Sequence, residues 1–406
     1  MRKQVIFSLL MGITLGWVQI SWAPFAEGDY NRPVVGEKPS EPSETPTWWN
    51  GGLQSDWEKA GRNRLPLFPF ALRIRNQIKF ELLDNLPANR VRIGAYDWLM
   101  KTETIQRKTR PIKFKHLENL MDNWASLANW MAAEGKFLYF ILNANKHHVL
   151  TTEDIMDSGV CPSHSKNFEK TFDARMKDAF EARNLQAFVV GPWLKAVHDT
   201  SQAPMWPRNG IHCSVASAEL IVDSAMHALS ELWSMKLPQR IKLGGEWDTK
   251  ARWADEDLEK SCNLLWDLPD DSLWYPSFDW DFSQTPRNTL PRVMRIGDSF
   301  GNQLHQYGGF AAAFHPSSRR FHYAREEVKY GLQFNEREVL ETKVTSDVLQ
   351  RELHASKGLV VEYSEATFIR HSENFFHSIE PILQEARLMS NGSLSGTTSA
   401  TSSSAD

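Results

Sequence analysis

One stretch of about a dozen residues constrains most tightly what this chain can fold into. Residues 293–296 alternate like a β-strand and lead into Gly297-Asp298-Ser299, after which residues 301–304 begin a helical pattern. A strand that turns directly into a helix is typical of α/β folds. Such a turn presents its hydroxyl beside unpaired N–H groups of the helix start, so Ser299 is a candidate nucleophile next to an oxyanion site. A helix start capped by Ser or Asp is the alternative interpretation.

Strand and helix patterns alternate along the rest of the chain. Residues 137–142 form a continuous apolar run, as in a parallel strand buried on both faces, and they follow a helical stripe that ends at Gly135. The pattern predicts a three-layer α/β/α sandwich with a mainly parallel sheet. Further strands are expected at residues 91–93, 186–190, 241–243 and 359–363, and further helices at 72–83, 168–179, 215–232 and 375–382.

Polar residues follow two of these elements. Asn145 and Lys146 come just after the buried strand, where α/β sheets place their binding sites, although a polar loop explains them equally well. His147 and His148 have no identifiable third metal ligand. His212 precedes a helix that Ser214 is expected to cap, and the positive end of that helix would disfavour the imidazolium and keep the ring available as a base.

The composition argues against a nucleic-acid partner. The chain has 46 basic and 50 acidic residues and a net charge of −4, and its basic residues form no stripe. Sixteen tryptophans are many for 406 residues; exposed indoles can stack on sugar rings, although most tryptophan is core. Cys161, Cys213 and Cys262 permit one disulfide in an oxidising compartment, and their spacing does not suggest zinc. Neither a metal nor a cofactor is expected.

The two ends of the chain differ from its centre. Residues 1–26 place Arg2 and Lys3 before an apolar run at 5–25, which predicts a signal anchor or signal peptide with the remainder outside the cytoplasm. Pro24 disfavours cleavage, so an uncleaved anchor is favoured. Composition divides the remainder into a Pro-rich linker at 27–47, a folded domain at 48–385 and a disordered Ser/Thr-rich tail at 386–406.

Five short motifs, in order along residues 48–385, resemble the alginate O-acetyltransferase AlgJ/AlgX family. Gly297-Asp298-Ser299-Phe300 is similar to its nucleophile block, and residues 206–214 are similar to its histidine block. Weaker matches are residues 93–99, the Asn-Lys pair at 145–146 and the strand at 359–365. The resemblance implies an SGNH hydrolase-like fold with circularly rearranged motif order, because the histidine precedes the serine here.

The resemblance also implies roles for individual residues. Ser299 would be the nucleophile and His212 the base, but the family's acid position two residues before the histidine holds Gly210. Asn209, another carboxylate such as Asp199, or a backbone carbonyl could orient the ring instead. The tryptophan that follows the family's histidine is Cys213 here. Support for the oxyanion and the active site is expected from Asp298, Gly301, Asn302 and Asn209.

The activity implied is transfer of an acetyl group through an acetyl-serine onto hydroxyls of an exported polysaccharide. Asn145, Lys146, Trp247 and Trp253 are the candidate substrate-binding residues. The resemblance implies a multi-spanning membrane O-acyltransferase as acetyl donor and a periplasmic location, anchored at the inner membrane by residues 5–25, or secreted to the periplasm if the signal is cleaved. Two alternatives stay open: a carbohydrate acetyl esterase and a non-catalytic polysaccharide-binding or assembly subunit.

Overall fold

The computed structural model describes residues 68–83, 86, 91–94, 97–102, 114–149, 172–252, 255–332 and 336–396. The chain divides into two units, residues 1–92 with 257–269 and residues 93–256 with 270–406. The predicted anchor and linker and residues Cys161 and Trp253 lie outside the described part. Within that part, none of the helices is long and apolar enough to cross a membrane.

The first unit contains helix α3 (Phe68–Leu83), as the apolar spacing predicts, and helix α10 (Asp257–Cys262). Asn76 on α3 donates from its amide to the carbonyl of Cys262 at 3.1 Å. Gln77 accepts from the backbone N–H of Leu265 at 3.1 Å. Two adjacent polar side chains of α3, both almost fully buried, therefore hold the end of α10 and the segment that follows it.

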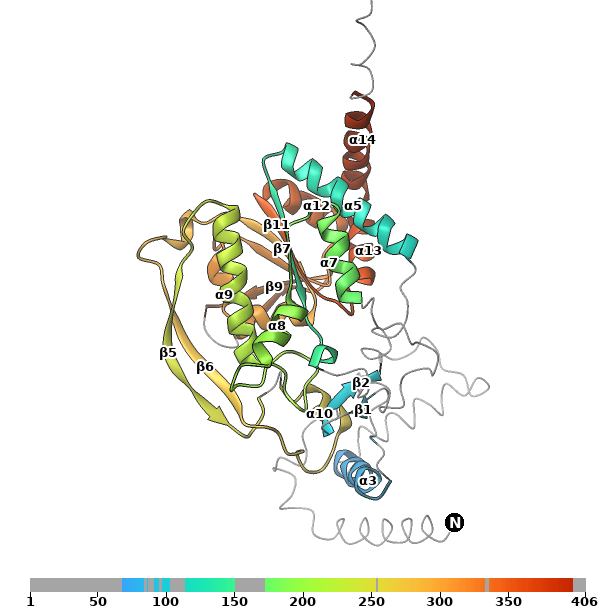
Figure 1. Cartoon of the computed structure of the whole chain (residues 1–406), viewed down its shortest axis with the longest axis vertical. Coiled ribbons are helices and arrows are strands. Elements are labelled where there is room, and N and C mark those ends of the chain that lie inside the picture. Colours follow the sequence, from blue (N-terminus) through green and yellow to red (C-terminus); the bar gives the residue numbers. More distant parts are fainter. Residues whose placement is uncertain are drawn as a thin grey trace, which may run out of the picture. The chain divides into compact units, whose positions relative to one another are not determined.

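The second unit is built on a seven-stranded sheet with the strand order β10-β9-β8-β7-β11-β3-β4 (Figure 1). Five neighbouring strands, from β8 to β4, run parallel, and β9 and β10 extend one edge antiparallel. This confirms the predicted mainly parallel α/β sheet. The strands are β3 (Phe137–Asn143), β4 (Ala187–Val189), β7 (Val293–Gly297), β8 (Arg319–His322), β9 (Glu326–Tyr330), β10 (Arg337–Glu341) and β11 (Gly358–Ser364).

Helices cover both faces of this sheet, which completes the expected three layers (Figure 1). One face packs against α8 (Val190–His198), α9 (Val215–Leu232) and α11 (Ser299–Gln306). The other packs against α5 (Phe114–Ala133), α7 (Phe172–Glu181), α12 (Ser346–Ala355), α13 (Phe368–Ser378) and α14 (Glu380–Gly396).

A twisted two-stranded ribbon packs on the outside of α9. It is formed by β5 (Gln239–Asp248) and β6 (Leu273–Asp281), of which sequence patterns predict only residues 241–243. Arg240 anchors the ribbon: its guanidinium lies 4.2 Å from the centre of the Phe278 ring, pairs with Asp223 at 2.8 Å and donates to the carbonyl of Gly308 at 2.7 Å. Trp280 is also buried there and belongs to the core.

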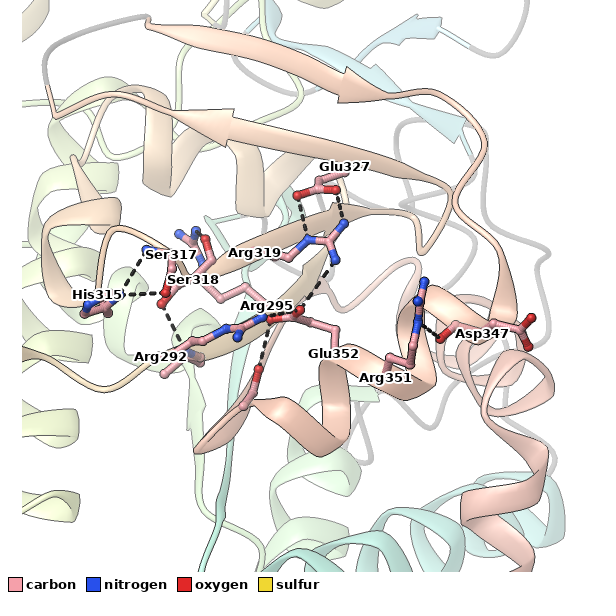
Figure 2. Close-up of polar contacts among 12 residues, drawn as sticks. Arg292, Arg295, His315, Ser317, Ser318, Arg319, Glu327, Asp347, Arg351 and Glu352 are labelled. Atoms are coloured by element: carbon pink, nitrogen blue, oxygen red, sulfur yellow. Dashed lines mark hydrogen bonds and ion pairs between the residues drawn. The ribbon is translucent and has the colours of Figure 1, made fainter. Parts of the chain in front are cut away.

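A chain of ion pairs lies at the end of the sheet where β7 and β8 begin. Figure 2 shows Glu352 on α12 between Arg292 and Arg319, at 2.7 and 3.5 Å, while Arg319 also pairs with Glu327 on β9. Glu352 is almost fully buried, so its two arginine partners offset the cost of removing its charge from water. These pairs tie α12 to the sheet at the end opposite the Ser299 turn.

The C-terminal segment departs from the expected single helix and early tail. The helix breaks at Ile379 and restarts at Glu380, because Pro381 has no N–H to continue the ladder and fits only the first turn of a new helix. α14 then runs to Gly396, past residue 385 where the composition suggests that the folded domain ends. Its Ala386 is fully buried, and the guanidinium of Arg387 donates to Asn123 on α5 at 3.1 Å.

Candidate active site

The turn between β7 and α11 forms as the alternating strand and the following helical pattern predict. β7 is buried along its whole length between two parallel neighbours, so it delivers Ser299 to the C-terminal edge of the sheet. Ser299 is the first residue of α11, and Asp298 is its N-cap. Asp298 is fully buried, whereas Ser299 is not.

Asp298 clamps this turn with both carboxylate oxygens. Oδ1 accepts from the backbone N–H groups of Phe300 at 2.9 Å and of Gly301 at 3.3 Å. Oδ2 accepts from the backbone N–H of Ser364 on β11 at 2.8 Å and from the Thr367 hydroxyl. Asp298 is therefore a structural cap that joins the nucleophile turn to the neighbouring strand.

Gly301 supports the site differently from the sequence-based expectation. Its N–H is already donated to Asp298, so it does not supply an oxyanion donor. What the position requires is space, because a Cβ there would lie 2.7 Å from a guanidinium nitrogen of Arg320 and 2.8 Å from the carbonyl oxygen of Glu362. Gly297 meets the same two residues at 2.6 and 2.8 Å. Both glycines let the turn lie directly against β8 and β11.

The loop that carries His212 is tied down on several sides. Lys146 donates from Nζ to the carbonyls of Leu99 and Arg208, at 3.0 and 2.8 Å. Ser214 caps α9 as predicted, since its hydroxyl accepts from the N–H of Ser217. On the other side of His212, the side-chain amide of Gln303 on α11 donates to the carbonyl of Cys213 at 2.8 Å. Gln303 therefore links the histidine loop to the helix that begins with Ser299.

These constraints bring the two principal candidate residues together across 87 positions of sequence. His212 Nε2 lies 3.0 Å from Ser299 Oγ, within hydrogen-bonding reach. The imidazole packs against the Phe300 ring with their centres 4.4 Å apart, and only 7% of His212 is exposed. A histidine in this geometry can accept the serine proton and return it to a leaving group.

Tyr323 is a further side chain at the nucleophile. Tyr323 and Ala324 both have φ near 54° and form the turn between β8 and β9, closed by the N–H of Arg325 on the carbonyl of His322 at 3.0 Å. Both central residues of a type I′ turn need positive φ, a conformation that costs a non-glycine residue free energy. Burial raises the pKa of Tyr323, and hydrogen bonds with the side chain and backbone of Ser299 oppose the rise. The strained turn aims the phenol at Ser299.

The predicted substrate-binding residues fall into three groups. Asn145 and Lys146 are almost fully buried, and Lys146 holds backbone carbonyls, so it supports the His212 loop. Trp247 is 49% exposed on β5 and packs against Trp274, their ring centres 5.4 Å apart. Trp253 lies outside the described residues. A sugar-binding role for Asn145 and the tryptophans stays a prediction.

Asp199 and Asn209, two candidates for orienting His212, differ in burial. Asp199 ends α8 at the surface and is paired with Lys195 at 2.7 Å. Asn209 is buried within the histidine loop itself, 1% exposed. Of these two candidates, Asn209 has the more suitable environment.

The described residues contain no group of three or more His, Cys, Asp or Glu side chains that could hold a metal ion. Neither Cys213 nor Cys262 is in a disulfide. Burial raises the pKa of Cys213 to about 12, so the residue beside His212 is a neutral thiol. It contributes a weak hydrogen bond to Gln303 and is not a second nucleophile.

Comparison with solved structures finds similar arrangements at low identity. The O-acetyltransferase domain of Pseudomonas putida AlgJ matches with a TM-score of 0.45 and 16% identity, over 69% of this chain and 92% of that one. Pseudomonas aeruginosa AlgX matches at 0.44 and 10%, over 69% and 67%. Bacillus cereus PatB1 matches at 0.38 and 11%, over 68% and 96%. No model of a protein family and no curated protein matches the chain.

Proposed function

We propose that this chain is an O-acyltransferase that moves an acetyl group through Ser299 onto a hydroxyl of an exported polysaccharide. The observation that carries the proposal is the 3.0 Å contact between His212 Nε2 and Ser299 Oγ at a strand-to-helix turn. The choice of acetyl as the transferred group and of a sugar as the acceptor rests on the resemblance of five ordered motifs to the AlgJ/AlgX family. An acid two residues before the histidine is not part of the site, since that position is Gly210.

His212 takes up and returns one proton in each half of the proposed reaction. His212 takes the Ser299 proton as Oγ attacks the acetyl carbonyl of an ester donor, and it returns that proton to the donor oxygen as the ester bond breaks. The acetyl group is then held on Ser299. In the second half, His212 takes the proton of a sugar hydroxyl, whose oxygen attacks the acetyl-serine, and then reprotonates Ser299 Oγ.

The tetrahedral intermediates need hydrogen-bond donors for their oxyanion. The N–H groups of residues 300–302 are already donated to Asp298. The donors proposed here are the Ser299 N–H, the side-chain amide of Asn302 and the Tyr323 hydroxyl. Asn302 follows Ser299 by three residues on α11 and so shares its face of the helix.

The acceptor and the partners follow from the resemblance. The acceptor proposed is an alginate-like or other exopolysaccharide at the periplasmic face, with a multi-spanning membrane O-acyltransferase as acetyl donor. For transfer to outrun hydrolysis, the sugar hydroxyl must be oriented beside the acetyl-serine, and oriented groups reach effective concentrations of about 10⁵ M or more. Trp247, which is 49% exposed, is the described aromatic side chain proposed to contact the sugar.

Intact-mass measurement on the full-length chain after exposure to an activated acetyl ester tests the proposal. The wild type should gain one acetyl group, which Ser299→Ala abolishes and His212→Ala strongly reduces. Ser317→Ala removes an exposed hydroxyl at the opposite end of the sheet and should acetylate normally. A folded wild type that never acquires the adduct contradicts the proposal and favours the polysaccharide-binding subunit. Adduct turnover to free acetate alone, with acceptor oligosaccharide present, favours the esterase.

A further inference from the structure

Asn302 accepts two hydrogen bonds on one side-chain oxygen. Arg320 donates to Oδ1 from Nη1 at 2.5 Å, and the Tyr330 hydroxyl donates to the same atom at 2.6 Å. Because a guanidinium can only donate, the Arg320 contact fixes which way round the amide lies. The NH₂ group of Asn302 is therefore directed away from Arg320 and Tyr330, and it is available as a donor elsewhere in the site.

Arg320 is fully buried and uses each of its three nitrogens. Nε donates to Glu362 at 2.9 Å, Nη1 to Asn302, and Nη2 to the carbonyl of Asp298 at 3.2 Å. One planar guanidinium thus contacts the central strand β11, the N-cap before Ser299 and the side chain three residues beyond it. A lysine carries a single nitrogen and cannot hold three diverging acceptors.

A second buried basic group fixes Glu362 from the other side. Glu362 accepts from Nε2 of His305 at 2.9 Å, and Nδ1 of His305 accepts from Arg295 at 3.2 Å. This arrangement requires a neutral His305 with its proton on Nε2, in accord with burial, which lowers the pKa of His305. Burial alone would raise the pKa of Glu362, but His305 and Arg320 outweigh it and the pKa is lowered. The carboxylate opposite Arg320 therefore stays charged.

The packing of the turn reflects the same guanidinium. Its Nη2 lies where a Cβ on Gly297 or Gly301 would come within 2.6 or 2.7 Å. Glycine at positions 297 and 301 therefore leaves room for the Arg320 guanidinium in the nucleophile turn. A purely stabilising charge pair with Glu362 does not require Arg320 to reach into the turn.

We propose that Arg320 is a positioning residue for acyl transfer, which holds the Asn302 amide in its donating orientation and fixes the Asp298 carbonyl at the start of α11. The inference rests on the proposed function of Ser299. A charged donor on Oδ1 also polarises the amide, so the Asn302 N–H becomes a stronger partner for a developing oxyanion. Arg320 acts through Asn302 and does not contact the reacting atoms.

The test compares two buried arginines in the full-length chain. Arg320→Lys should lower the rate constant of Ser299 acetylation by about 10²-fold, because a misplacement of the order of an ångström costs that much, while KM for the acetyl ester changes little. Arg240→Lys is the matched control: Arg240 is also buried against a carboxylate, a carbonyl and an aromatic ring, but on the β5–β6 ribbon. Both variants should melt several degrees earlier, and only Arg320→Lys should lose acetylation rate.

A second reaction separates failure of this inference from failure of the proposed function. Sulfonylation of Ser299 by a sulfonyl fluoride needs the same nucleophile geometry but no acetyl donor, so it should slow in Arg320→Lys even if the wild type never forms an acetyl adduct. Tyr330→Phe removes the neutral donor to Asn302 and should slow both reactions about fivefold with the fold intact. Equal rate losses in Arg320→Lys and Arg240→Lys, or unchanged rates in Tyr330→Phe and a folded Arg320→Lys, overturn the inference.

Discussion

Replacing Gly301 with alanine tests whether catalysis depends on how closely α11 lies against β11. A Cβ at this position would be 2.7 Å from Arg320 and 2.8 Å from both the backbone oxygen and the Cβ of Glu362, where ordinary contact begins at 3.4 Å. The guanidinium cannot swing aside without leaving Glu362, and the carbonyl belongs to the central strand. The helix start must therefore move by about 0.6–0.7 Å, the shortfall in those contacts.

The displacement should affect stability and activity to different extents. Alanine in a helix gains up to about 1 kcal/mol over glycine, and overpacking costs about 1–3 kcal/mol, so the net loss of unfolding free energy should be about 0–2 kcal/mol. A shift of this size moves Ser299 relative to His212 and disturbs their 3.0 Å contact. Acetylation should then slow by about 10²-fold.

Gly135→Ala provides a control with matched destabilisation. Gly135 ends α5 with φ of 65° and has open space where a Cβ would lie, so alanine there costs about 1–2 kcal/mol of backbone strain without a clash. The assay is the rate of acetyl-adduct formation by mass spectrometry, beside a thermal melt of each variant. A folded Gly301→Ala that acetylates at the wild-type rate refutes the argument. So does an equal rate loss in Gly135→Ala.

Three further predictions concern the Tyr323 hydroxyl, the loss of stability at acidic pH and the C-terminal helix. Tyr323→Phe keeps the ring but removes the hydroxyl at Ser299, so acetylation should slow by about 10-fold or more at unchanged stability; unchanged acetylation removes Tyr323 from the oxyanion site. Burial lowers the pKa of His322 to about 3 from 6.5, so the unfolded chain binds the extra proton and stability falls as the pH drops below 6.5. His322→Gln should recover about 2 kcal/mol of the loss between pH 6.5 and 5 in urea titrations, and identical pH slopes contradict this. A chain ending at Glu385 should melt several degrees below one ending at Gly396; equal melting temperatures mean that the second half of α14 contributes nothing.

Regular elements with strong local patterns could be predicted from the sequence. β3 is a continuous apolar run, and α9 begins and ends where its apolar stripe and its serine cap indicate. The turn at Ser299 was predictable for the same reason, since an alternating strand ends in a glycine before a helical pattern. Each of these signals lies within about 20 consecutive residues, so no distant contact is needed to interpret it.

The segment between Ser299 and β11 has no such signal. This segment looks like charged surface, yet residues 319–322, 326–330 and 337–341 form β8, β9 and β10, and Arg320 is fully buried. The charge of Arg320 is tolerated because Glu362, 42 residues later, comes to lie beside it. Sequence patterns cannot identify a buried charge whose partner is remote, so they give such a residue a surface position.

The same limitation applies to Tyr323. Turns with two residues of positive φ are usually marked by Asn-Gly or Asp-Gly, and here the two residues are Tyr323 and Ala324. The conformation is held by pairing on both sides, including the Tyr323 N–H on the carbonyl of Gly297 at 2.8 Å. A turn maintained against local preference beside a candidate nucleophile indicates a functional constraint.

Gly210 can be understood by separating the two tasks of a triad acid. One task is to position the imidazole, and here Lys146, Ser214 and Gln303 fix the loop that carries His212 by contacts that need no carboxylate at 210. The other task is to stabilise the imidazolium that forms as Ser299 loses its proton, and a glycine cannot contribute to it. In a serine protease, losing the acid while keeping the geometry costs about 10⁴-fold in rate. Position 210 supplies none of this charge, so in the proposed mechanism the stabilisation comes from other groups around His212 and from the oxyanion donors proposed at Asn302 and Tyr323.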